Sequence, residues 1–262
     1  AVLDFIIKTP TSGGSFMGNF TPSLNRGWGQ YWTSVKVNTS KSEFSYSGWF
    51  APRWNLEMGR SNTERYELAD GSRYVRTEQS QKGSGFEAWH NGHTLNYNFL
   101  DPQKQTFNAS LNFNNNNYKN KYKGILTDER PGGIENNMYD RTKYISLHPS
   151  LNLYYQNNLK KDQLIMANLV TSYEASHSHR LYNENDLATD APMVNIDNLI
   201  KGKTFSVLGE VDYEKTWKNS RFTAGIRHTQ SWIQNKYVEQ NTIDRMNQGN
   251  SYIFGEYWLR LG

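Results

Sequence analysis

The sequence predicts an all-β fold made of the antiparallel strands of a transmembrane β-barrel, and three observations support that prediction. Apolar and polar side chains alternate over long stretches, which is typical of strands with two different faces. The connections between these stretches are alternately short and long. The composition, finally, is too rich in aromatic and polar residues for an ordinary two-sided hydrophobic core.

The clearest alternation lies in residues 204–232 and predicts a β-hairpin. One face of its first arm carries Phe205, Val207, Gly209, Val211, Tyr213 and Trp217, and the second arm continues that face with Phe222, Ala224, Ile226 and Trp232. The turn is expected at Lys218, Asn219 and Ser220. Each arm runs to about a dozen residues, enough for the ~9 to 11 that a tilted strand needs to cross a bilayer.

About ten barrel strands are expected in all. They fall at residues 16–24, 31–40, 44–58, 86–99, 107–113, 145–155, 165–169, 204–217, 221–232 and 251–262. In the third of them Phe44, Leu56 and Met58 are predicted to share one face, and Asp70 with Gly71 is expected to form a turn in the connection that follows it.

Connections are expected to be short near residues 41, 103, 160 and 219, and long at residues 59–85, 114–142, 176–203 and 235–250. Outer-membrane barrels have this asymmetry, with short periplasmic turns and long extracellular loops. The last segment alternates and then stops without a turn, so the sequence predicts a partial barrel.

Composition narrows the class further. Only 36% of the 262 residues are hydrophobic, 14% are aromatic, and the mean hydropathy is −0.84. No run of about 18 apolar residues exists, which excludes a helical membrane protein. The charge of +4 arises from 29 basic and 25 acidic residues without a basic run, so no nucleic-acid partner is expected. The chain has no cysteine, which excludes disulfides and thiolate metal sites.

Histidines are the first candidates for chemistry. His177 and His179 lie two residues apart, so a strand places both on one face, and Glu174 is near them in sequence. No further ligand at a metal-binding spacing accompanies them. His90 and His93 are three apart, a spacing that converges on a helix but not on a strand. No metal site is therefore predicted.

Carboxylates are the second candidates. Glu210, Asp212 and Glu214 follow one strand face, and same-face neighbours lie roughly 6 to 7 Å apart. They are expected to line a water-facing wall, balanced by Arg221 and Arg227 across the turn. Nucleophile, phosphate-loop and dinucleotide motifs are missing from the sequence. We expect no catalytic residue, no cofactor and no enzyme activity.

Aromatic residues near strand ends suit the headgroup level of a membrane. The candidates for such a girdle are Trp28, Tyr31, Trp32, Trp54, Trp89, Trp217 and Trp232. The alternative is that they stack on a sugar ligand.

Residues 2–8, with the sequence Val-Leu-Asp-Phe-Ile-Ile-Lys, resemble the last plug strand of TonB-dependent outer-membrane receptors of the Bacteroidetes type. Residues 16–20, Phe-Met-Gly-Asn-Phe, resemble the start of the first barrel strand. The resemblance implies a plug end and linker at residues 1–13 and a β-barrel region at residues 14–262, about half of a 22-stranded barrel.

The same resemblance implies the function. Such a receptor imports a nutrient ligand, possibly a glycan, a peptide or a chelated metal, across the outer membrane of a Gram-negative bacterium. Its expected partners are outer-membrane lipid and the energy-coupling inner-membrane TonB complex, which contacts a segment absent from this chain. The alternatives are a small passive outer-membrane porin or adhesin barrel and a soluble β-rich glycan-binding module, whose Phe and Trp residues would point into a core.

Overall fold

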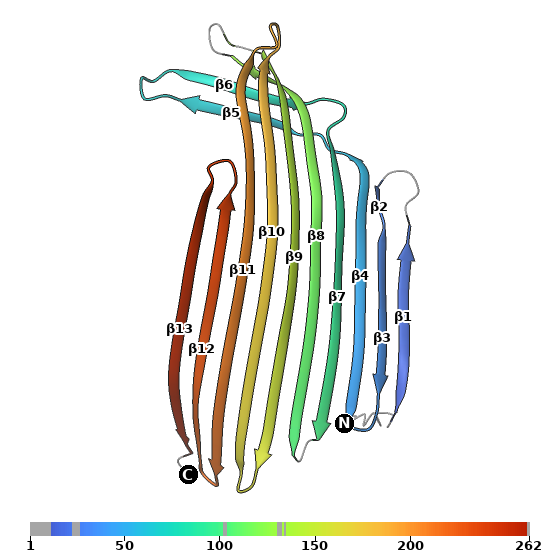
Figure 1. Cartoon of the computed structure of the whole chain (residues 1–262), viewed down its shortest axis with the longest axis vertical. Helices are drawn as coiled ribbons and strands as arrows, with labels where there is room; N and C mark the ends of the chain where they lie inside the picture. Colours follow the sequence, from blue (N-terminus) through green and yellow to red (C-terminus); the bar gives the residue numbers. More distant parts are fainter. Residues whose placement is uncertain (1–11, 23–26, 102–103, 130–132, 134, 261–262) are drawn as a thin grey trace, which may run out of the picture.

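The computed structural model describes residues 12–22, 27–101, 104–129, 133 and 135–260. Within these residues the chain forms a single antiparallel sheet of thirteen strands and is all-β, as predicted (Figure 1). Residues 2–8, expected to form a plug strand, lie outside the described part. No helix in the described ranges is long and apolar enough to span a membrane.

Ten strands follow one another across the sheet in the order β1, β3, β4, β7, β8, β9, β10, β11, β12 and β13. Their bounds are Gly13–Thr21, Gln30–Asn38, Ser42–Glu57, Gly85–Asp101, Gln105–Asp128, Glu135–Leu159, Gln163–Asp186, Pro192–Trp217, Ser220–Tyr237 and Thr242–Leu259. Off this path β2 (Gly27–Trp28) pairs with β4, while β5 (Ser61–Glu67) and β6 (Arg73–Ser80) form a hairpin that joins β8.

The hairpin predicted at residues 204–232 is present as β11 and β12. Val211 lies opposite Ile226, and Phe205 opposite Trp232 with their rings stacked at 5.6 Å. The turn consists of Lys218 and Asn219, since Ser220 already belongs to β12. The arms are longer than expected, at 26 and 18 residues.

All four predicted long loops are largely strand, since residues 235–250 hold the end of β12 and the start of β13. The expected count of about ten strands is corrected to thirteen in the described residues, because β2, β5 and β6 lie off the ten-strand path. Residues 114–142 and 176–203 hold the far halves of β8, β9, β10 and β11, which run on to short tips (Figure 1). Residues 59–85 form β5 and β6, with the predicted turn at Asp70 and Gly71 closed by a hydrogen bond from the Gly71 amide to the Leu68 carbonyl at 2.8 Å. Backbone pairing needs no apolar alternation, so polar segments can extend a sheet.

A β-bulge in β4 changes which face its last residues share. Asn55 has a φ of 51°, and the pairing with β7 shifts between Arg53 and Leu56. Leu56 therefore lies opposite Phe86, on the other face from Phe44. The prediction that Phe44 and Leu56 share one face is wrong, because the extra residue of a bulge inverts the alternation.

The sheet is curved, and the curvature is visible in one ion pair. Arg76 on β6 and Glu184 on β10 are separated by β8 and β9, yet their side chains meet at 2.6 Å. They can do so only on a concave face. Ala88, Leu126 and Met138 are the buried hydrophobic residues of the described part, and the pairing registers put all three on this side.

The opposite, convex face is apolar and exposed in its lower part, near the turns that join β9 to β10 and β11 to β12. Val211 and Ile226 are 49% and 52% exposed there. The outermost strands β1 and β13 each have one neighbour among the described strands, so the sheet is open. Its large apolar side chains are the most exposed of all at these edges: Phe16 is 75% and Ile253 85% exposed.

Candidate binding surface on the concave face

The concave face is lined by polar side chains over most of its height. Asparagines follow the alternate positions of β7 and β8, and serines and threonines continue the face on β11 and β12. Thr94 donates a hydrogen bond to Asn112 at 2.9 Å, and Ser206 and Ser231 lie 2.9 Å apart. Short uncharged groups of this kind leave many donors and acceptors free for water or a polar ligand.

A charged hollow of about 300 Å³ opens on this face at the far end of the long strands. Its walls are Arg60, Asn62, Glu64, Arg76, Glu78, Leu126, Arg180 and Tyr182. The hollow exists because the β5–β6 hairpin bends across the top of the sheet and β6 pairs with the end of β8 (Figure 1).

One wall of this charged hollow is an ion pair between Arg76 and the buried Glu184. The Arg76 guanidinium donates to Glu184 at 2.6 Å and to the Tyr182 hydroxyl at 3.4 Å. Glu184 also accepts hydrogen bonds from Tyr182 and, at 3.3 Å, from Asn136. These contacts on one buried carboxylate tie β6, β9 and β10 together.

The second wall holds the other two arginines. Arg60 donates to Glu78 at 2.6 Å and lies over the ring of Tyr122 at 4.5 Å. Arg180 makes a two-point contact with Asp140, at 3.1 and 3.3 Å. Planar guanidinium groups suit such forked contacts with carboxylates. Each guanidinium is thereby fixed in orientation.

The surroundings favour the charged form of two of the arginines, Arg76 and Arg180. A hydrogen bond to Asp140, against the cost of burial, raises the pKa of Arg180. Burial works against the charge of Arg76, but Glu184 and its neighbours more than offset it and raise the pKa of Arg76. Burial first, and then the hydrogen bond to Glu184, raises the pKa of Tyr182 well above its usual value. The tyrosine therefore stays a neutral hydrogen-bond donor.

The hollow combines three guanidinium groups, from Arg60, Arg76 and Arg180, with four carboxylates, from Glu64, Glu78, Asp140 and Glu184. Because the charges nearly balance, it offers paired donors and acceptors rather than a strong net field. Such a site can bind a polar ligand. The residues described by the structure contain no group of three or more His, Asp or Glu side chains placed to hold a metal ion.

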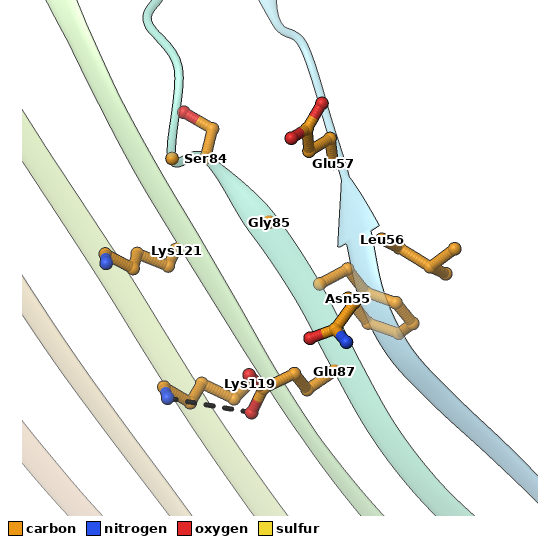
Figure 2. Close-up of a pocket in the computed structure, with 10 residues that line it drawn as sticks. Asn55, Leu56, Glu57, Ser84, Gly85, Glu87, Lys119 and Lys121 are labelled. Atoms are coloured by element: carbon orange, nitrogen blue, oxygen red, sulfur yellow. Dashed lines mark ion pairs between the residues drawn. The ribbon is translucent and has the colours of Figure 1, made fainter. Parts of the chain in front are cut away.

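A larger hollow of about 470 Å³ lies at the β4 bulge (Figure 2). Glu57 and Glu87 border it, together with Lys119 and Lys121 of β8. The Lys119 ammonium lies 3.7 Å from the Glu87 carboxylate. The pairing register places Lys119 and Lys121 on the convex side of the sheet, so this hollow is separate from the charged one.

The structure keeps His177 and His179 on one face but separates them from Glu174. His177 and His179 share the convex face of β10, but Glu174 lies on the other face and takes no part. His179 pairs instead with Asp197 at 2.7 Å. His90 and His93 lie on opposite faces of β7, in keeping with the expectation that their spacing does not converge on a strand.

Glu210, Asp212 and Glu214 do share the concave face of β11, as predicted. Arg227 lies directly opposite Glu210, while Arg221 lies opposite Thr216. No ion pair joins these carboxylates to either arginine in the described part of the chain. Arg227 therefore lies opposite a carboxylate, as expected, but the side chains form no direct contact.

The predicted aromatic girdle divides between the two faces. The registers place Tyr31, Trp89, Trp217 and Trp232 on the convex face and Trp54 beside the bulge. Trp28 and Trp32 lie on the concave face. The Arg53 guanidinium lies over the Trp28 ring there, 5.4 Å from the ring centroid. These two residues cannot belong to a girdle on the convex side.

Sequence reasoning missed the arginines of the charged hollow. Arg76 and Glu78 of β6 and Glu64 of β5 do alternate with other residues, which would have placed them on one face. This alternation predicts a shared face only if residues 59–85 form strands and not a loop.

No family model matches the sequence, and no curated protein matches it. Among solved structures, the chain is similar to the crystal structure of the ferric citrate transporter FecA in its unliganded form, with 10% sequence identity and a TM-score of 0.46. The alignment covers 97% of this chain and 40% of the transporter. The chain thus spans less than half the length of that protein.

Proposed function

We propose that the chain is a segment of a β-barrel in the outer membrane of a Gram-negative bacterium and that the barrel imports a nutrient ligand. The concave face is the wall of the lumen, and the charged hollow is part of the ligand-binding surface at its outer mouth. The role is binding and passage, without enzymatic chemistry and without a cofactor.

The observation that carries this proposal is the exposed apolar band on the convex face. On β11 the band runs from Phe205 to Trp217, with one charged side chain, Lys215, near its lower end. This span corresponds to about 40 Å along a strand that rises ~3.3 Å per residue. A tilt of ~40° reduces this to about 30 Å in height, close to the hydrocarbon thickness of a bilayer. Soluble proteins rarely leave a continuous apolar surface of this size in water.

The open edges support a larger barrel. Backbone groups of β1 and β13 that face away from the sheet would lack partners in lipid, and no spanning structure tolerates that. Further strands must therefore complete the wall. Outer-membrane lipid is the partner of the convex face.

The shape of the sheet supports one orientation in the membrane. One end has tight turns, and the other has strands that continue far beyond the apolar band (Figure 1). Membrane barrels of this class keep their short turns in the periplasm and their long extensions outside the cell. The charged hollow then opens to the exterior, where a ligand arrives.

The finer proposal is a TonB-dependent receptor, in which an inner-membrane complex supplies the energy for uptake. It rests on the resemblance of residues 2–8 and 16–20 to that family. Polar side chains throughout the lumen suit glycans, peptides or chelated metals, since all three present many hydrogen-bonding groups.

The test uses the complete gene product in its own host. An epitope inserted into the β10–β11 tip, at residues 187–191, should bind antibody on intact cells, and deletion of the gene should abolish growth on one nutrient source in a panel of glycans, peptides and iron chelates. Uptake should also fail when the TonB complex is inactivated. An epitope that is accessible only after the outer membrane is broken would contradict the orientation, and uptake independent of TonB would favour a passive porin.

A further inference from the structure

Cationic side chains collect on the convex face just beyond the apolar band. They come from six adjacent strands, β8 to β13, and we call them the basic belt: Lys119, Lys121, Arg141, Lys143, His177, His179, Lys201, Lys203, Lys236 and Arg245. On β11 the nearest belt residue, Lys203, lies two residues before Phe205, and on β9 Lys143 lies two residues before Ile145. The belt therefore follows the upper border of the apolar band.

Several of these cations lie directly opposite one another. Lys119 pairs in register with Lys143, and Lys121 with Arg141. Lys201 of β11 is likewise opposite Lys236 of β12. Like charges in directly opposed positions destabilise a sheet. Three such pairs in one belt indicate a surface that gains stability when an anion neutralises it.

The protein itself supplies few counter-charges on this face. Glu87 forms an ion pair with Lys119 (Figure 2), with the ammonium 3.7 Å from the carboxylate, and Asp197 lies 2.7 Å from His179. In the described part of the chain, Lys143, Lys201 and Lys203 form no ion pair, and all three are exposed. Their charge is available to an external partner.

The lining of a hollow of about 380 Å³ indicates which kind of molecule that partner is. Lys203 and Arg245 are its cations, while Tyr173, Phe205 and Trp232 form an apolar wall on the side of the membrane band. A site with cations above and aromatic rings below fits an amphipathic molecule with an anionic headgroup and an apolar chain. It does not fit a ligand that is polar throughout.

We propose that the basic belt binds the phosphate groups of a phosphorylated lipid in the outer leaflet of the membrane. This inference rests on the proposed membrane placement, since the belt lies at headgroup level only if the apolar band lies in the bilayer. The lipid phosphates then lie between opposed cations such as Lys201 and Lys236, and an acyl chain covers Phe205 and Trp232. Lysine and arginine are the usual phosphate-binding residues.

The experiment compares two triple variants of the full-length protein, extracted in nonionic detergent and freed of lipid. The belt variant carries K143Q, K201Q and K203Q; the control variant carries K160Q, K161Q and K218Q, which remove the same charge from turns at the other end of the sheet. The probes are diphosphorylated lipid A in detergent micelles, the same lipid without phosphates, and inorganic phosphate. Binding is measured by the shift in unfolding temperature and by titration.

Each cation near an anionic lipid surface contributes about fivefold to binding. The belt variant should therefore bind diphosphorylated lipid A on the order of 100-fold more weakly than the unaltered protein, and the control variant should bind it unchanged. Dephosphorylated lipid should bind weakly to all three proteins. Equal affinity of the belt variant and the control would overturn the inference, as would equal protection by inorganic phosphate.

Membrane assembly is measured separately, by heat-modifiable mobility and by recovery in the outer-membrane fraction. A belt variant that assembles normally and still binds the phosphorylated lipid contradicts the lipid site alone. If the unaltered protein does not fractionate with the outer membrane, the proposed function itself fails.

Discussion

Strands β8 to β11 can be divided into a lower half, near the turns that join β9 to β10 and β11 to β12, and an upper half, which ends at the charged hollow. The two halves belong to the same ladders but are stabilised differently. In the lower half the convex face is apolar and the concave face polar, with no ion pair across the concave side of β11 and β12 in the described residues. In the upper half both faces are polar, and Arg76, Arg180 and Glu184 hold β6, β9 and β10 together. Each of these strands thus exchanges one kind of stabilisation for the other along its length.

This difference explains why the sequence predicts the lower half well. An apolar face opposite a polar face imposes a strict alternation, as at Phe205 and Val207 against Ser206. That pattern revealed the strands and one complete hairpin.

The upper half carries no such pattern, because both of its faces are polar. The sequence therefore predicts loops at Asn114 to Asn117 and around Ser178, although their backbones pair as strands. The bulge at Asn55 and the ion pair between Arg76 and Glu184 also depend on contacts between distant segments. No local pattern encodes them.

The largest expected effect comes from the lower half. Deleting Asn219 shortens the turn between β11 and β12 by one residue, and a shift of one residue inverts the faces of one arm. Arg221 and Arg227 would then face lipid, at ~2 to 4 kcal/mol each near the midplane and less toward the interfaces. We expect no assembled protein in the outer-membrane fraction.

The epitope insertion at residues 187–191 is the matched control, because a tip in water tolerates added length. Normal assembly after deletion of Asn219 would show that register in the lower half is not fixed by lipid.

A smaller effect is expected at the ion pair of the upper half. Arg76→Ala leaves the buried Glu184 without its cation, at a cost of about 1 to 3 kcal/mol, discounted because a third of the Arg76 side chain is exposed. The β5–β6 hairpin should lose hydrogen-exchange protection at residues 73–80 while the lower strands keep theirs. Arg73→Ala, which breaks only an exposed pair with Glu67, should leave protection unchanged. Equal loss of hydrogen-exchange protection in both variants would show that the ion pair between Arg76 and Glu184 does not hold the hairpin in place.

Gly124 tests how closely β6 approaches β8. A β-carbon there would lie 2.7 Å from the backbone oxygen of Gln79, so Gly124→Ala must push the hairpin away, at about 1 to 3 kcal/mol. At Gly209 in the lower half nothing lies within 4 Å of the added atom, and Gly209→Ala should be neutral. Proteolysis of the hairpin should increase in the first variant alone. Similar proteolysis of both would contradict the close approach.

The smallest effect is a pH dependence confined to the upper half. The pKa of Tyr182 is raised in the folded protein, chiefly by burial, so above the ordinary tyrosine value of 10.0 the unfolded state ionises first and gains stability. Protection of the β6 and β10 ends should therefore fall as the pH rises above about 10, and Tyr182→Phe should reduce that fall. A fall of equal size in the variant would assign it to other groups.

The central claim is that the convex face of the lower half meets lipid and the concave face meets water. Single cysteines at Phe205, Val207 and Phe222 should react with a lipid-soluble reagent in intact membranes, and cysteines at Ser206, Asp212 and Thr223 with a water-soluble one. Ser206 is next to Phe205 and Val207, and Thr223 is next to Phe222, so these positions are matched in depth in the membrane. Clear separation of the two sets is the result that the account predicts, and equal reactivity of both sets with both reagents would contradict it.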